Sequence, residues 1–218
     1  MVSYFYTHAR DPVSSFTHYI GLCCAVLGSL LLILRARALQ TGTGTLVSAV
    51  VFGFSLIALY AASTLYHFYQ GSDRVLLRLR KLDHANIYVL IAGTYTPIVA
   101  HSMAPAAARR FLWIIWAVAA AGIVVKLCWL MAPRWLYTSL YLLMGWAIVF
   151  DWHSFGAIEP GCMRLVAAGG LCYSAGAVIY IAKRPVISKN FGFHEIFHLF
   201  ILLGSLLHYL AVFFYVLQ

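Results

Sequence analysis

Two histidines that could bind a metal ion, His194 and His198, lie four residues apart near the C-terminus, at the start of a long apolar segment. On a helix this spacing places both imidazole rings on one face, about 6 Å apart, which suits a single metal ion. Glu195 lies between them, so the stretch also matches His-Glu-x-x-His, the zinc-protease pattern in which the glutamate is the general base. Because two ligands do not complete a site, a metal here needs a third ligand from elsewhere in the chain.

The third ligand is expected from His67, which follows Ser63 by four residues near the end of another apolar segment. On a helix, the Ser63 hydroxyl and the His67 imidazole share a face. Taken alone, His67 is explained at least as well as a histidine at a membrane interface, so its assignment as a ligand depends on the other candidate residues.

Asp83 begins a third apolar segment and brings a carboxylate that could act on water. An acid at this place is also explained as a helix N-cap or as a first-turn residue favoured by the helix dipole. The neighbouring His84 is rotated by about 100° from Asp83 on a helix, so we expect it to point away from such a site.

Considered together, these residues favour a zinc site with one position open for water. Ionisable groups at membrane depth are costly, and they usually face the interior of a helix bundle and pair with one another. His67, His194 and His198 would supply three nitrogen ligands, and Asp83 would orient or deprotonate the water. Ser63 would hydrogen-bond to the same water or to a substrate oxygen. This chemistry suits the hydrolysis of an amide or an ester.

The zinc-protease interpretation explains the same stretch less well. His194 begins a bounded apolar segment, and the third ligand would have to come from far upstream in the chain. We therefore interpret Glu195 as incidental to the His-x-x-x-His pair.

The composition indicates a polytopic membrane protein. Of 218 residues, 63% are hydrophobic and 10% are charged, whereas the apolar share of a soluble domain is about half. A membrane span needs about 20 apolar residues, so the chain has room for about seven spans and for no soluble domain. The sequence therefore predicts an all-α membrane protein in which residues 1–218 form a single bundle of seven transmembrane helices.

The predicted spans are bounded by charged residues, Gly or Pro and cover about residues 16–35, 45–69, 82–101, 110–131, 135–153, 163–182 and 194–217. The chain before the first span has no short apolar core followed by a small-residue cleavage site, so we expect the first span to remain as an uncleaved anchor. Two polar residues inside spans are expected to be structural. Lys126 should extend toward the inner membrane interface, and His208 should be a hydrogen-bonded core histidine.

The basic residues indicate how the helices cross the membrane. Nine Lys and Arg residues precede the first span or follow the second, fourth and sixth spans, and five lie on the opposite side. The larger group comprises Arg10, Arg74, Arg78, Arg80, Lys81, Arg134, Lys183, Arg184 and Lys189. Because positive loops stay in the cytoplasm, we expect a cytoplasmic N-terminus and an outer C-terminus. The candidate site then lies at the cytoplasmic end of the bundle.

A formal net charge of +9 could indicate a nucleic-acid partner. The basic residues, however, lie at the ends of apolar segments rather than among exposed aromatic residues. Membrane orientation and contact with lipid headgroups explain them better, so membrane lipids are the expected partners and nucleic acid is not.

In this order and on these segments, the motifs resemble the hemolysin III family of bacterial membrane proteins, which is related to the progestin and adipoQ receptors and, more distantly, to alkaline ceramidases. The matching motifs are Ser63-x-x-x-His67, Asp83-His84-x-x-Ile87-Tyr88, Ala92-Gly93-Thr94-Tyr95-Thr96-Pro97, Tyr141-Leu142-Leu143-Met144-Gly145-Trp146, His194-x-x-x-His198 and Gly204-Ser205-x-x-His208. Near the first span, Thr17-His18-Tyr19-Ile20-Gly21 also fits, with Asp11 where a Glu is expected. The resemblance covers nearly the whole chain.

The resemblance implies a seven-helix fold with a cytoplasmic-side Zn²⁺ bound by His67, His194 and His198, and with Asp83 holding the water. It also implies a ceramidase-type lipid hydrolase, while the bacterial members carry a cytolytic or pore-forming name and are linked to membrane-lipid homeostasis. Two functions follow as hypotheses. One is a zinc-dependent hydrolase of lipid amide or ester bonds in a bacterial inner membrane. The other is a pore-forming cytolysin or receptor-like protein with a structural zinc.

Overall fold

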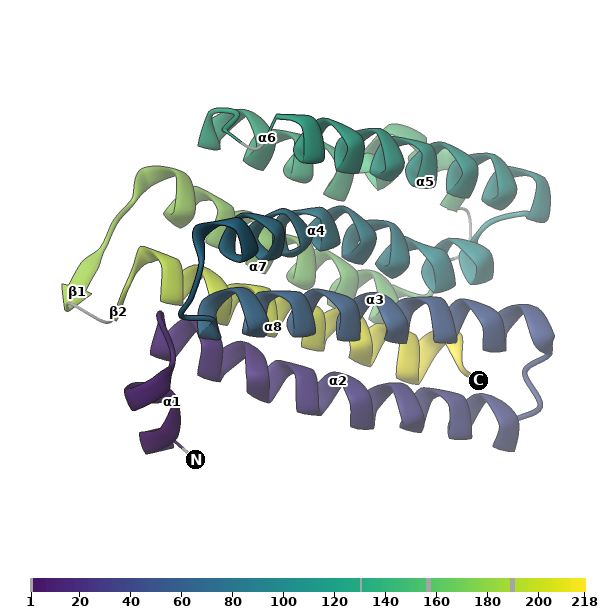
Figure 1. Cartoon of the computed structure of the whole chain (residues 1–218). Helices are drawn as coiled ribbons and strands as arrows, with labels where there is room; N and C mark the ends of the chain where they lie inside the picture. The colour runs from purple at the N-terminus through teal and green to yellow at the C-terminus, as the bar shows by residue number, and fades with distance from the viewer. Residues whose placement is uncertain (1, 130, 156–157, 189–190) are drawn as a thin grey trace.

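A computed structural model of the chain describes residues 2–129, 131–155, 158–188 and 191–218, which are almost entirely helical. The α-helices are α1 (Val2–His8), α2 (Pro12–Ala38), α3 (Thr43–Phe68), α4 (Asp73–Ser102), α5 (Pro105–Cys128), α6 (Arg134–Gly145), α7 (Pro160–Ala182) and α8 (Phe193–Ala211). A 3-10 helix at Ala147–Phe155 follows α6, and a π-helical turn at Val212–Val216 continues α8. Two short antiparallel strands, β1 (Val186–Ser188) and β2 (Phe191–Gly192), form a small projection between α7 and α8 (Figure 1).

Consecutive long helices run back and forth and pack against one another (Figure 1). Helix α3 packs against both α2 and α4, α4 packs against α5, and α7 packs against α8. Helix α8 also contacts α2, so the last long helix packs beside the first long helix. Short connections impose this antiparallel packing of neighbouring helices.

Five of the helices in the described part of the chain are long and apolar enough to cross a membrane: α2, α3, α5, α7 and α8 with its continuation. Their outer faces carry large exposed apolar side chains such as Phe54 and Trp113, which suits contact with lipid. The prediction of a membrane protein made of apolar helices is therefore confirmed. The remaining two predicted spans correspond to α4, whose first turns are charged, and to α6, which is short.

Two helices differ in extent from the predicted spans, for different physical reasons. Helix α4 begins at Asp73, ahead of the predicted start at about residue 82, because charged residues such as Arg78 extend the helix beyond its apolar part. Asp83 consequently lies inside α4 and is neither an N-cap nor a first-turn residue. The fifth predicted span, 135–153, is helical as α6 only as far as Gly145, and the 3-10 helix that follows has a non-helical kink at Asp151.

The prediction for Lys126 is also wrong. Its side chain does not extend to the interface, because it is only 2% exposed. The amine lies 3.6 Å from the centre of the Tyr137 ring on α6, whose negative π face attracts a cation. The expected core role of His208 is confirmed, since the residue is buried and its Nδ1 lies 2.8 Å from the carbonyl oxygen of Gly204.

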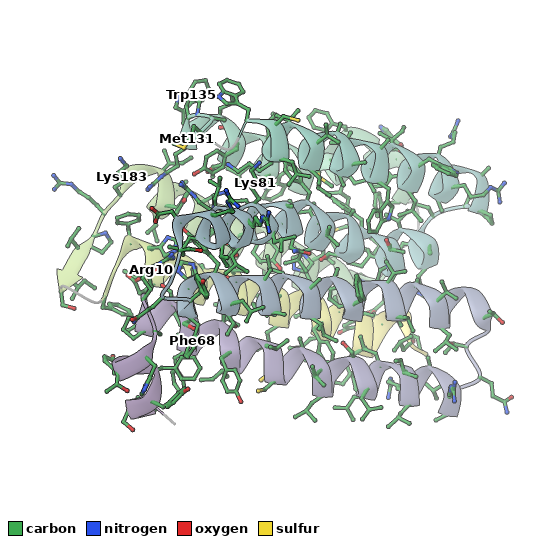
Figure 2. The ribbon with its side chains drawn as sticks, in the orientation of Figure 1. Arg10, Phe68, Lys81, Met131, Trp135 and Lys183 are labelled. Atoms are coloured by element: carbon green, nitrogen blue, oxygen red, sulfur yellow. The ribbon has the colours of Figure 1, made fainter. Side chains whose placement is uncertain are left out.

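Members of the larger basic group lie at one end of the bundle, as the sequence predicts. Figure 2 shows Arg10, Lys81 and Lys183 at the end where α2 and α8 begin and α3 ends. Lys189, another member of the larger basic group, lies outside the described residues. The two chain ends lie at opposite ends of the long helices (Figure 1).

Candidate metal centre

Three imidazoles meet at the basic end of the bundle. His67 lies in the last turn of α3, and His194 and His198 lie in the first turns of α8. One ring nitrogen from each of the three lies within 4.8 Å of the others. The helices supply this arrangement because α3 ends where α8 begins, so residues more than a hundred positions apart in the sequence face the same point.

The geometry of this cluster, named the histidine cluster below, fits a metal ion. The Nε2 atoms of His67 and His194 are 3.4 Å apart, whereas two nitrogens bound to a tetrahedral zinc at about 2.05 Å would be about 3.3 Å apart. His198 is buried, and one of its ring nitrogens completes the group of three within 4.8 Å of one another. The three histidines can therefore hold a metal ion that prefers imidazole ligands.

Asp11 lies directly behind the histidine cluster, just before the first residue of α2. Its Oδ2 lies 2.9 Å from Nδ1 of His67 and also accepts a 2.8 Å hydrogen bond from Arg10. Burial opposes ionisation of the Asp11 carboxyl, but hydrogen bonds from His67 and Arg10 outweigh it and lower the pKa to about 2. From the sequence Asp11 has no assigned role, although the resemblance to a family with an acid at this position was a signal for it.

Ser63 and Asp83 lie together beside the histidine cluster. Ser63 is buried one helical turn before His67, and its side chain lies beside the Asp83 carboxylate on α4. Both residues line the same cavity as His194 and His198. The structure thus brings together all five residues selected from the sequence, while the catalytic roles of Ser63 and Asp83 remain predictions.

His84, which was expected to point away from this group, packs against tyrosine side chains of α6. Its ring centre is 5.6 Å from that of Tyr137, and its carbonyl oxygen accepts a 3.1 Å hydrogen bond from the Tyr141 hydroxyl. The ring still borders the cavity, but it is not part of the histidine cluster.

The cavity has a volume of about 310 Å³ and runs from the histidine cluster into the interior of the bundle. It lies between α4, α6, α7 and α8, and apolar side chains such as Leu90, Ile98 and Val166 form most of its wall. It extends along α8 from His198 to His208, ten residues further on, which corresponds to about 15 Å of helix. The cavity therefore joins a polar, metal-binding mouth to an apolar interior.

Glu195 has a structural position rather than a catalytic one. One carboxylate oxygen accepts a 2.8 Å hydrogen bond from the backbone N–H of Gly192, which closes the first turn of α8. The other accepts a 2.9 Å hydrogen bond from the Ser14 hydroxyl of α2. Both oxygens therefore hold the start of α8, which agrees with the interpretation of Glu195 as incidental to the metal-binding pair.

His18 is another buried histidine beside the cluster, and its motif in the sequence indicates no role for it. Its ring stacks on that of His198, with ring centres 3.8 Å apart and planes tilted by 17°. Neither ring nitrogen has a hydrogen-bond partner among the described residues, and the ring borders the cavity. The ring of His18 thus forms a flat wall behind one of the three candidate ligands.

Comparison with known proteins agrees with the resemblance found in the motifs. The family model described as Haemolysin-III related matches residues 6–209. The chain is 33% identical over 212 residues to the Hemolysin-3 homolog of Bacillus subtilis (strain 168), covering 96% of each chain. It is 33% identical over 216 residues to Hemolysin-3 of Bacillus cereus, covering 95% of this chain and 92% of the relative.

A human relative shows how far this similarity extends. The chain is 26% identical over 214 residues to the Monocyte to macrophage differentiation factor of Homo sapiens, covering 95% of this chain and 83% of that protein. The part of the chain matched by the family model includes the histidine cluster, because all three histidines lie within residues 6–209. The chain therefore belongs to the haemolysin-III related family of membrane proteins.

Proposed function

We propose that this protein is a seven-span membrane protein that hydrolyses an amide or ester bond of a membrane lipid, with Zn²⁺ held by His67, His194 and His198. The observation that carries the proposal is the position of Ser63 and Asp83, which line the same apolar cavity as His194 and His198. A lipid hydrolase needs these two parts in contact: a polar group that activates water and an apolar space that receives an acyl chain.

The residues at the mouth of the cavity have different roles in the proposed hydrolysis. When bound, Zn²⁺ supplies Lewis-acid chemistry that polarises a carbonyl and makes water acidic enough to attack it. The Asp83 carboxylate takes up the proton that the attacking water loses, and it later returns a proton to the leaving amine or alcohol. The Ser63 hydroxyl, which lies beside Asp83, would donate a hydrogen bond that orients the carboxylate.

The apolar wall of the cavity accounts for the choice of a lipid. Side chains such as Ile91 and Ile201 remove an acyl chain from water, which stabilises the complex in proportion to the apolar area buried. The same wall keeps bulk water away from Asp83, so that electrostatic interactions at the mouth are stronger than in water. In this proposal the lipid enters from the inner leaflet, because the basic end of the bundle faces the cytoplasm of a bacterial cell.

Lipid analysis of membranes treated with wild-type protein and with an Asp83→Ala variant tests the hydrolase. Wild type should release a fatty acid or consume an amide or ester lipid, and Asp83→Ala should not. Purified wild type should also contain stoichiometric zinc that is lost in His67→Ala, His194→Ala and His198→Ala. A wild-type protein that is free of metal and still hydrolyses lipid, or one that changes no lipid, would contradict the proposal.

A pore is the second candidate function, and the printed name Hemolysin-3 of the Bacillus cereus relative favours it. In that case the metal would only join α3 to α8. Leakage of dye from liposomes separates the two functions, because a pore should persist in Asp83→Ala whereas leakage caused by lipid hydrolysis should stop. Asp73→Ala, which removes an exposed acid from the first turn of α4, is the matched control.

A further inference from the structure

The short segment between α1 and α2, residues 9–11, lies against the end of α3 and is called the strap below. The backbone N–H of Arg10 donates to the carbonyl oxygen of Phe68 at 3.3 Å, and that of Asp11 donates to the carbonyl oxygen of His67 at 2.9 Å. The Arg10 guanidinium lies 4.4 Å from the centre of the Tyr66 ring. The strap is therefore attached to α3 by its backbone, independently of the Asp11 side chain.

The Asp11 side chain acts on one nitrogen of His67. Oδ2 of Asp11 lies 2.9 Å from Nδ1 of His67, and an ionised carboxylate can only accept hydrogen bonds. The proton of the neutral ring must therefore be on Nδ1, which leaves the lone pair on Nε2. This Nε2 is the atom that faces Nε2 of His194 at 3.4 Å. The hydrogen bond on one ring nitrogen thus decides which nitrogen is available to a metal.

Arg10 keeps the Asp11 carboxylate in place. Its Nε and Nη2 atoms donate to Oδ2 of Asp11 at 3.0 and 2.8 Å. The same oxygen accepts the hydrogen bond from His67. The side chains of Arg10 and Asp11 are 29% and 40% exposed, whereas that of His67 is 4% exposed. An ion pair this exposed contributes little to stability. The pair instead fixes the orientation of the Asp11 carboxylate, so that its charged oxygen faces the buried His67 ring.

We propose that Asp11 is a positioning residue of the metal centre: it holds His67 in the Nδ1–H tautomer and directs Nε2 toward the ion. The inference rests on the proposed metal site but assigns a determinant outside the three ligands. Histidines that bind metals commonly donate their second N–H to a carboxylate, and loss of that carboxylate weakens metal binding. The affinity of this centre therefore depends on a residue that touches neither the metal nor the substrate.

The affinity of the full-length protein for Zn²⁺, measured by competition with a chelator, tests the inference. Asp11→Ala should weaken zinc binding about 10- to 100-fold. Asp11→Asn should fall between Asp11→Ala and wild type, because its amide oxygen still accepts from Nδ1 but carries no charge. Asp73→Ala should bind zinc like wild type. Unchanged affinity in Asp11→Ala would overturn the inference, and Asp11→Asn carries the test where Asp11→Ala does not fold.

The tautomer of His67 gives a second readout that requires no metal. In metal-free wild type, nitrogen NMR of labelled histidine should show His67 protonated at Nδ1, and in Asp11→Ala a mixture of the two tautomers. A purely structural role for Asp11 would lower the unfolding temperature and leave both the tautomer and the zinc affinity unchanged. If wild type binds no metal, the proposed function fails while the tautomer still decides the role of Asp11.

Discussion

Glu195 stands between two candidate ligands in the sequence, and its neighbours in space favour a structural role for it over that of a catalytic base. Its two carboxylate oxygens accept hydrogen bonds from the Gly192 backbone and from the Ser14 hydroxyl. A general base must be free to receive a proton from water at the reacting centre. In the proposed mechanism Asp83 has this role, and it borders the cavity from a different helix.

Substitution of Glu195 separates these roles. Glu195→Gln should keep hydrolysis and zinc binding, because Gln can close the first turn of a helix as Glu does. Glu195→Ala should lower the free energy of unfolding by about 1–2 kcal/mol, since it removes the helix-capping interaction and a link to α2. Thermal unfolding and lipid hydrolysis measured on both variants check this. Loss of hydrolysis in a zinc-loaded Glu195→Gln would favour the protease interpretation instead.

Ser63 is expected to affect the reaction without affecting the metal. Ser63→Ala removes the hydroxyl that is proposed to orient Asp83, and the rate of hydrolysis should fall about tenfold, corresponding to about 1.4 kcal/mol in the barrier. Zinc content should stay at the wild-type level, because Ser63 is not one of the three ligands. Thr64→Ala, one residue further on α3, is a matched control. Equal rates in Ser63→Ala and wild type would contradict the role given to this hydroxyl.

At the scale of helices, the histidine cluster links the end of α3 to the start of α8. A metal bound there should stabilise the contact between the two helices by mass action. With free zinc about 1,000-fold above its dissociation constant, the gain in unfolding free energy is about 4 kcal/mol. Addition of a chelator should therefore lower the unfolding temperature of wild type and have no effect on His194→Gln. An equal effect of chelator on both proteins would show that the stabilising metal binds elsewhere.

The contact between α7 and α8 depends on a missing side chain at Gly169. A Cβ at Gly169 would overlap the ring of His208 and lie 3.2 Å from the Gly204 carbonyl oxygen. The ring cannot move easily, because it is hydrogen-bonded to Gly204 and stacked on Tyr173. Gly169→Ala should therefore lower the free energy of unfolding by about 1–3 kcal/mol. A Cβ at Gly170 meets nothing closer than 3.8 Å, so Gly170→Ala is the matched control for the unfolding measurement.

The helices and the histidine cluster could be predicted from the sequence because both depend on local patterns. Apolar segments and charged loops mark the long helices, and the spacing of His194 and His198 identifies one face of α8. The start of α4 could not be found in this way, because its first turns are charged and carry no hydrophobic signal. The pairing of Asp11 with His67 was also missed. It depends on backbone hydrogen bonds that join the strap to the end of α3, and no local sequence pattern indicates them.

At the scale of the whole molecule, the asymmetry of charge predicts the orientation in the membrane. The end that carries Arg10, Lys81 and Lys183 should face the cytoplasm, and the C-terminus, at the other end, should face outward. An alkaline phosphatase fused to the C-terminus should then be active in bacterial cells, and a green fluorescent protein fused there should be dark. The opposite pattern would place the histidine cluster on the outer side and the lipid substrate in the outer leaflet.

The strap lies outside the long apolar helices, and this position makes the histidine cluster sensitive to the ionic strength of the surrounding solution. The His67 side chain is buried, but the Arg10–Asp11 pair that supports it is partly open to water. Mobile ions screen such exposed charges within a Debye length of about 8 Å at physiological ionic strength. Changes in ionic strength on the side of the strap should therefore affect the buried histidine cluster, although the ions themselves do not enter it.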